Sequence, residues 1–116
     1  MPGELNLNYL YAFADNDISF VKEILELMDK NIPTDLDSIE KALDSNDLAL
    51  VTRNAHHMKS SVQYIDYVEL SDFLSEIETK KDSPTAIAEI KGMMPQLKKL
   101  LDNLVQLIQA EMKKLA

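Results

Sequence analysis

Apolar residues recur at three- and four-residue steps along almost the whole chain, and this periodicity constrains the fold more than any other feature. The clearest case is the segment from about Asp47 to Gln63 or Ile65. Its apolar stripe has no gap and consists of Leu48, Val51, Ala55, Met58, Val62 and Ile65. Such spacing gathers side chains on one face of an α-helix. The segment is therefore predicted to be an amphipathic helix that packs against others.

The same spacing predicts three helices before this segment. Apolar residues from Leu5 to Phe13 indicate a short N-terminal turn or helix, which ends in the polar run 15–17. A second helix is expected from Ile18, with Asp17 as its N-cap, and Asn31-Ile32-Pro33 is expected to end it. A third is expected to begin at Thr34, a good N-cap residue, and to end at Ser45-Asn46-Asp47.

Two more helices are predicted after it. One carries Leu70, Phe73, Leu74 and Ile77 and is closed by the polar run 79–83. Ser83-Pro84 then gives an N-cap followed by proline at the first helical position, a strong start signal. An amphipathic pattern continues from there to the end of the chain. Gly92 and Pro95 interrupt it, and a kink or short break is expected there.

The composition supports an all-α protein. The chain has 116 residues with only two glycines and four prolines, and 46% of its residues are hydrophobic. We see no linker and no internal repeat, so residues 1–116 are predicted to form a single domain. Several amphipathic helices with short connections favour an up-down helical bundle.

Charge and cysteine content exclude several classes of function. The formal net charge is −8, whereas nucleic-acid binding depends on lysine and arginine neutralising phosphates, so no nucleic-acid partner is expected. The absence of cysteine excludes disulfides, thiolate chemistry and iron–sulfur clusters. No stretch resembles a signal peptide or a membrane span. We therefore expect a cytoplasmic protein without a membrane partner.

Both histidines of the chain, His56 and His57, lie in the middle of the most regular helix. At about 100° per residue, each lies roughly 130° from the centre of the apolar stripe, on opposite sides. Both should therefore reach the surface or a groove between helices, and periodicity alone does not choose between them. Their neighbours one turn away differ. Those of His56 are Thr52, Lys59, Ser60 and Gln63, which offer one cation, small groups and hydrogen-bond donors, while those of His57 are Leu50, Arg53, Ser61 and Tyr64.

The run Ala55-His56-His57-Met58-Lys59-Ser60-Ser61 resembles the signature of histidine phosphotransfer (HPt) domains, roughly Ala-His-x-Leu/Met-Lys-Gly/Ser-Ser/Ala. The resemblance extends to the helix order over most of the chain. It implies an N-terminal capping helix and then a four-helix bundle, with the motif on the second bundle helix and a long last helix. Two positions depart from the family pattern: Ser60 stands where glycine is frequent, and Asp66 stands where a second glycine often ends the helix.

The resemblance also implies a function. His56 aligns with the phosphate-accepting histidine, Lys59 with the lysine that stabilises the phosphate, and Ser60 with the small residue that leaves room for a partner. Ser60 and Gln63 can add hydrogen bonds, although for Gln63 this indication is weak. An imidazole titrates near pH 6.5 in model peptides, so much of it is neutral and nucleophilic at cytoplasmic pH.

The implied protein is a phosphoryl carrier without autokinase activity. Its expected partners are response-regulator receiver domains and a hybrid sensor histidine kinase. It needs no cofactor of its own, because the receiver would bring the magnesium ion. On the same resemblance, it is expected to be a monomer.

Other interpretations of the sequence remain open. The main alternative is a helical scaffold or protein-interaction module whose histidines do no chemistry. A metal site is less well supported, because Arg53 and Asn54 stand where a di-iron bundle would need a carboxylate, and there is no His-Glu-x-x-His motif. No nucleophile–base pair, phosphate loop or cofactor fingerprint indicates an enzyme that acts on a small molecule.

Overall fold

The structure is a computed structural model that describes residues 5–115, and in this part of the chain it contains helices and no strands. Five α-helices are joined by short connections, two of which contain a 3₁₀ turn. The elements are α1 (Asn8–Phe13), α2 (Ile18–Asp44), α3 (Leu48–Val62), η1 (Gln63–Ile65), α4 (Val68–Thr79), η2 (Lys80–Asp82) and α5 (Ala86–Leu115).

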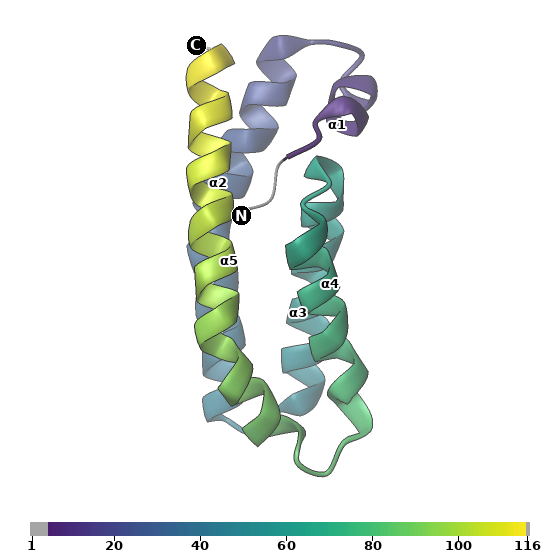
Figure 1. Cartoon of the computed structure of the whole chain (residues 1–116), viewed down its shortest axis with the longest axis vertical. Helices are drawn as coiled ribbons and strands as arrows, with labels where there is room; N and C mark the ends of the chain where they lie inside the picture. The colour runs from purple at the N-terminus through teal and green to yellow at the C-terminus, as the bar shows by residue number, and fades with distance from the viewer. Residues whose placement is uncertain (1–4, 116) are drawn as a thin grey trace.

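The helices α2 to α5 run alternately down and up, as Figure 1 shows. The two long helices, α2 and α5, lie side by side along the full length of the molecule, and the shorter pair, α3 and α4, packs beside them. Helix α1 covers the end of this shorter pair and contacts η1. The predicted four-helix bundle with an N-terminal capping helix is confirmed. The two histidines lie on α3, the second helix of the bundle.

Side-chain caps and left-handed residues make the tight connections before α2 and α3. The carboxylate of Asp17 accepts a hydrogen bond from the backbone N–H of Phe20 at 3.3 Å, which confirms it as an N-cap. Asp47 caps α3 in the same way, through the N–H of Leu50 at 3.1 Å. Asn46 adopts a φ of 54°, a conformation that asparagine tolerates better than most residues, and so lets the chain reverse between α2 and α3.

The prediction of a helix end at Asn31-Ile32-Pro33 is wrong, because α2 continues through Pro33 to Asp44. Thr34 is therefore inside the helix and caps nothing; its carbonyl accepts a hydrogen bond from the Ser38 hydroxyl. Pro33 removes only the N–H that would bond to the carbonyl of Asp29. Because Pro33 lies on the exposed side of α2, water can reach that carbonyl. Packing of α2 against α3 and α5 holds both halves in line.

The expected start of the last helix at Ser83-Pro84 is also wrong, and so is the expected break within that helix. It begins at Ala86, and Pro84 lies in the preceding turn, where the Ser83 hydroxyl accepts from the N–H of Thr85. No break occurs at Gly92 or Pro95, and α5 is continuous to Leu115. The exposed Pro95 is accommodated as Pro33 is, on the solvent side of a helix whose other face is buried.

The core follows the predicted apolar stripes. Five of the six stripe residues of the histidine-bearing segment are buried, and Leu48 is partly buried. Leu70, Leu74 and Ile77 of α4 and Leu97, Leu101, Leu104 and Ile108 of α5 complete the same core. Burial of this face fixes the rotation of α3, and therefore fixes which side chains it presents to solvent. None of the helices in the described part of the chain combines the length and apolarity that crossing a membrane requires.

Candidate functional site

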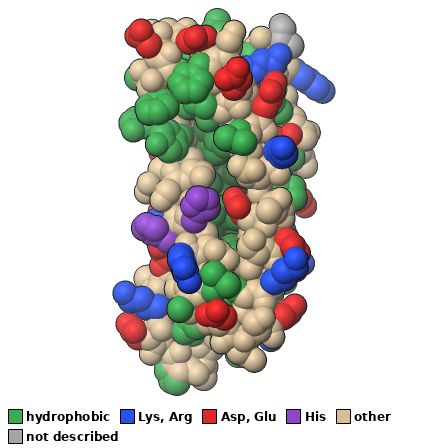
Figure 2. Space-filling model, turned by 180° about the vertical axis from the view of Figure 1, so that it is seen from behind, with side chains coloured by type: hydrophobic (Ala, Val, Ile, Leu, Met, Phe, Trp, Pro, Cys, Tyr) green, Lys and Arg blue, Asp and Glu red, His purple; other side chains and the backbone are tan. Residues whose placement is uncertain are grey.

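Helix α3 presents His56 and His57 on either side of its buried stripe, and both side chains are exposed, as predicted. Figure 2 shows the two rings on one face of the molecule. They face different neighbours. His56 is turned towards α4, where it meets Glu78, and His57 lines a groove between α3 and α2. The structure thus separates two residues that periodicity alone could not distinguish.

Glu78 of α4 joins His56 to Lys59. One carboxylate oxygen lies 2.6 Å from Nδ1 of His56, and the other accepts a hydrogen bond from Nζ of Lys59. Lys59 follows His56 by three residues, so one carboxylate on the neighbouring helix reaches both side chains. The ion pair of Glu78 with Lys59 is largely enclosed, with Lys59 19% and Glu78 21% exposed, whereas the His56 side chain is 66% exposed. The site therefore consists of a solvent-exposed imidazole, His56, hydrogen-bonded to a largely enclosed Glu78–Lys59 ion pair.

The carboxylate also determines which ring nitrogen is available for chemistry. Partial burial raises the pKa of Glu78, but hydrogen bonds from Lys59 and His56 outweigh it, so this pKa lies below its ordinary value and the group is ionised near neutral pH. An ionised carboxylate only accepts hydrogen bonds, so Nδ1 of His56 carries the hydrogen and donates it. Nε2, on the other side of the ring, then keeps its lone pair and can act as a nucleophile.

Of the other predicted site residues, the structure brings Lys59 to His56 and places Ser60 and Gln63 farther along the same face. The Ser60 hydroxyl donates to the backbone carbonyl of His56 at 3.1 Å. Gln63 is exposed at the C-cap of α3. It lines a shallow depression with Ser60, Tyr64 and Tyr9, the last of which belongs to α1.

Sequence reasoning missed Glu78. It lies 22 positions after His56, on a different helix, next to the buried Ile77. One sequence gives no signal that pairs these positions, because the contact depends on how α3 and α4 pack.

Sequence reasoning also missed a group of exposed aromatic side chains near the site, here called the aromatic patch: Tyr9, Phe13, Phe20 and Tyr64. Their rings contact one another, with centroids 5.6 Å apart for Tyr9 and Tyr64 and 5.5 Å apart for Phe13 and Tyr64. Phe13 was grouped with the apolar residues of the N-terminal helix but is 54% exposed. Figure 2 shows hydrophobic side chains gathered beyond the histidines, towards the α1 end of the molecule.

This arrangement suits group transfer from a partner better than metal binding or reaction in a cavity. No cluster of three or more metal-ligating side chains is present among the described residues. The His56 ring is open to a second macromolecule, and a lysine lies beside it to offset negative charge. The fold and the site together define a histidine phosphotransfer protein, an up-down helical bundle with one oriented, solvent-facing imidazole.

Comparison with known proteins agrees. The family model described as the Hpt domain matches residues 23–111, and the chain belongs to this family, whose function is histidine phosphotransfer in a phosphorelay. Among solved structures, a similar one is the HPt domain of a sensor hybrid histidine kinase from Shewanella. It has 23% sequence identity and a TM-score of 0.65, and the match covers 95% of this chain and 91% of that one. Comparison with curated protein sequences gave no match.

Proposed function

We propose that His56 accepts a phosphoryl group through Nε2 from the aspartyl phosphate of a receiver domain, and passes it to an aspartate of another receiver. One observation carries this assignment: Glu78 holds Nδ1 of His56 while the ring remains open to solvent. Of the two histidines, only His56 has a ring nitrogen bound to a carboxylate in the described part of the chain. His57 keeps no such partner among the described hydrogen bonds and ion pairs.

The proposed phosphoryl transfer requires no proton to leave the site, because the hydrogen on Nδ1 stays in place throughout. The lone pair of Nε2 attacks phosphorus, the P–O bond to the receiver aspartate breaks, and that aspartate leaves as a carboxylate. The ring then carries a phosphoryl group on Nε2, a hydrogen on Nδ1 and a positive charge that the Glu78 carboxylate offsets. In the onward step a carboxylate oxygen of the second receiver's aspartate bonds to phosphorus, the P–N bond breaks, and neutral imidazole leaves with its hydrogen still on Nδ1. Alignment and charge compensation are the main requirements of such a step.

Lys59 supplies the positive charge for the phosphoryl oxygens. Its Nζ is held beside His56 by Glu78, so it needs little reorganisation to contact an incoming phosphate. Ser60 contributes a small surface next to the ring, and its hydroxyl can turn from the His56 carbonyl to the phosphate. Gln63 is the remotest candidate for a hydrogen bond.

The partners follow from the same chemistry. We propose that the chain is a carrier without autokinase activity, that a hybrid sensor kinase supplies its phosphate, and that the magnesium ion arrives with the receiver. We also propose that the protein is cytoplasmic, that it is a monomer and that it binds no nucleic acid.

The aromatic patch marks the direction from which a receiver would approach. A specific interface covers about 800 Å² on each partner, a patch roughly 16 Å in radius, and exposed aromatic residues are typical anchors of such interfaces. A receiver centred on His56 would reach Tyr64 and Tyr9, which share a depression with Ser60. We propose that the patch forms the apolar part of the receiver-docking surface.

The test is phosphotransfer from a labelled, phosphorylated receiver to wild type, His56→Gln and His57→Gln. Acid-labile label on wild type and His57→Gln, and none on His56→Gln, is the expected result. Label that disappears only in His57→Gln would overturn the residue assignment. Binding of receivers without any transfer would favour the scaffold alternative.

A further inference from the structure

A groove between α2 and α3 lies on the His57 side of α3 and takes no part in the chemistry described above. Its volume is about 180 Å³. Its floor is apolar and buried, formed by Met58, Val62 and Leu104. Its rim includes the exposed side chains of Leu27 and Tyr64.

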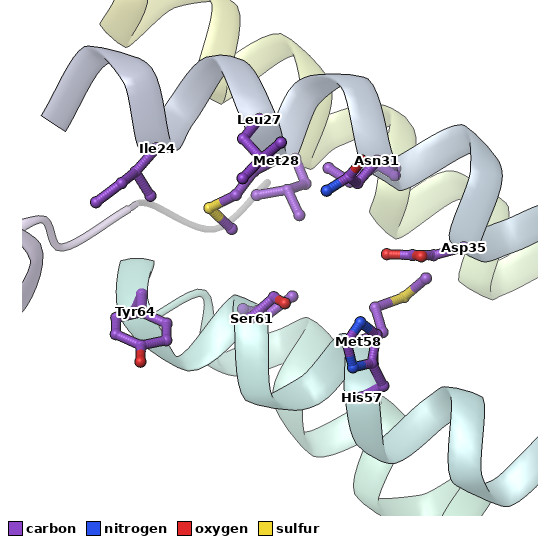
Figure 3. Close-up of a pocket in the computed structure, with 12 residues that line it drawn as sticks. Ile24, Leu27, Met28, Asn31, Asp35, His57, Met58, Ser61 and Tyr64 are labelled. Carbon is purple, nitrogen blue, oxygen red and sulfur yellow. The ribbon is translucent and has the colours of Figure 1, made fainter. Parts of the chain in front are cut away.

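One end of the groove is polar. Figure 3 shows Asp35 of α2 reaching into the space between the two helices, with His57 and Met58 facing it from α3. Asp35 is partly buried, and this burial raises its pKa, while the charge of His57 acts in the opposite direction. Besides Asp35 and His57, the only titratable residue among the described residues that line the groove is Tyr64, and α5 contributes only the apolar Leu104. On the helix of His57, the charged residue Arg53 lies one turn before it. Asp35 and His57 thus face each other across the polar end of the groove.

The inference rests on the proposed function, because a receiver that docks on His56 would also cover this groove. His57 follows His56 directly, and Tyr64 belongs both to the groove rim and to the aromatic patch. A partner whose aspartate reaches His56 and whose surface covers Tyr64 therefore covers the mouth of the groove. The water that now solvates Asp35 would be displaced.

We propose that Asp35 and His57 form a proton-linked anchor for the receiver: docking takes up a proton, so that an imidazolium of His57 compensates the Asp35 carboxylate across the groove. Covering a carboxylate without compensation costs free energy, since its hydration is lost. Protonation of the facing imidazole removes most of that cost. The affinity for the receiver therefore rises as the pH falls through the range in which an imidazole titrates.

The test measures the dissociation constant of an unphosphorylated receiver by titration calorimetry at pH 6 and pH 8. Every variant carries His56→Gln, which removes the titration of the other exposed imidazole. One fully linked proton changes affinity at most tenfold per pH unit, or about 100-fold between pH 8 and pH 6. Linkage is partial over this range, so we expect binding about fivefold tighter at pH 6. Adding His57→Gln or Asp35→Asn should reduce the difference to less than about twofold. Repeating the titration in buffers of different ionisation enthalpy should show proton uptake only when both groups are present.

Asp37→Asn is the matched control, because it removes one carboxylate from the same helix at a position paired with Lys41 and outside the groove lining. It should keep the full pH dependence. A pH dependence that survives His57→Gln, or that Asp37→Asn also removes, overturns the anchor. A light-scattering mass showing that the groove pairs two copies of this chain also overturns it. If receiver binding by these variants does not change with pH and the wild-type chain still accepts phosphate on His56, the anchor alone is overturned. If the wild-type chain neither binds receivers nor accepts phosphate, the proposed function is overturned.

Discussion

Replacing Glu78 with glutamine keeps the shape of the side chain and removes its charge, so it tests directly how the site prepares His56. The amide oxygen can still accept from Nδ1, but the bond is no longer charge-assisted, and the positive charge that develops on the ring is no longer offset. A charge-assisted hydrogen bond is roughly twice as strong as a neutral one, a difference of about 1.4 kcal/mol. Phosphoryl transfer should therefore be about tenfold slower.

The loss should affect the rate of transfer rather than receiver affinity, because Glu78 binds Nδ1 of the ring and is itself largely enclosed. Quenched-flow measurement of label transfer at several receiver concentrations separates the two effects. Nitrogen NMR of the imidazole should show the Nδ1-hydrogen form dominant in wild type and mixed in Glu78→Gln. Glu76→Gln, an exposed carboxylate two residues away on α4, is the matched control and should behave as wild type.

The same substitution has a pH-dependent effect on stability. The folded-state pKa of Glu78 is lowered by its hydrogen bonds with Lys59 and His56, although burial opposes this. Its contribution, about 1–2 kcal/mol for hydrogen bonds to a charged group, is therefore present above the unfolded-state pKa and is lost as pH falls through the folded-state value. Urea unfolding should show wild type more stable than Glu78→Gln at pH 6, and the difference should shrink as the pH falls below the ordinary range of a glutamate side chain. Unchanged transfer, an unchanged tautomer and equal stability at pH 6 would refute the role assigned to Glu78.

Four further substitutions test other parts of the structure. Pro33→Ala should stabilise the protein by about 2 kcal/mol in urea unfolding, because it restores a helical hydrogen bond within α2; destabilisation would contradict a continuous helix. Asp66→Gly should stabilise by about 0.5–1 kcal/mol, since Asp66 has a φ of 53°, and an unchanged midpoint would show that this conformation carries no strain. Tyr67→Phe should raise the thermal midpoint by an amount equivalent to about 1 kcal/mol, as its buried hydroxyl makes no hydrogen bond of ordinary geometry among the described residues and interacts only weakly with Asn103; a clear loss would show that the Asn103 interaction stabilises the fold. Phe13→Ser should weaken receiver binding about tenfold by calorimetry, and an unchanged affinity would exclude the aromatic patch from the docking surface.

The wrong helix boundaries of the sequence-based prediction all lie at or near a proline. Pro33 and Pro95 were expected to interrupt helices, yet the apolar stripe continues in phase across both of them. In α2, Met28 and Ile32 precede Pro33, and Ile39 follows it on the same face. The burial of that face over the full helix outweighs the one hydrogen bond that each proline removes, and this balance depends on the neighbouring helices.

The sequence by itself determined the all-helical bundle, the exposure of both histidines and the family signature around His56. These features follow from residue spacing along single helices, which is a local property. Only the tertiary structure decided that Glu78 holds Nδ1 of His56, and that His57 faces Asp35 instead. The first is a hydrogen bond and the second a shared groove, and both involve two helices, so they depend on the rotation and register in which α2 and α4 pack against α3. That register is set by burial of the whole core, and no short stretch of sequence contains it.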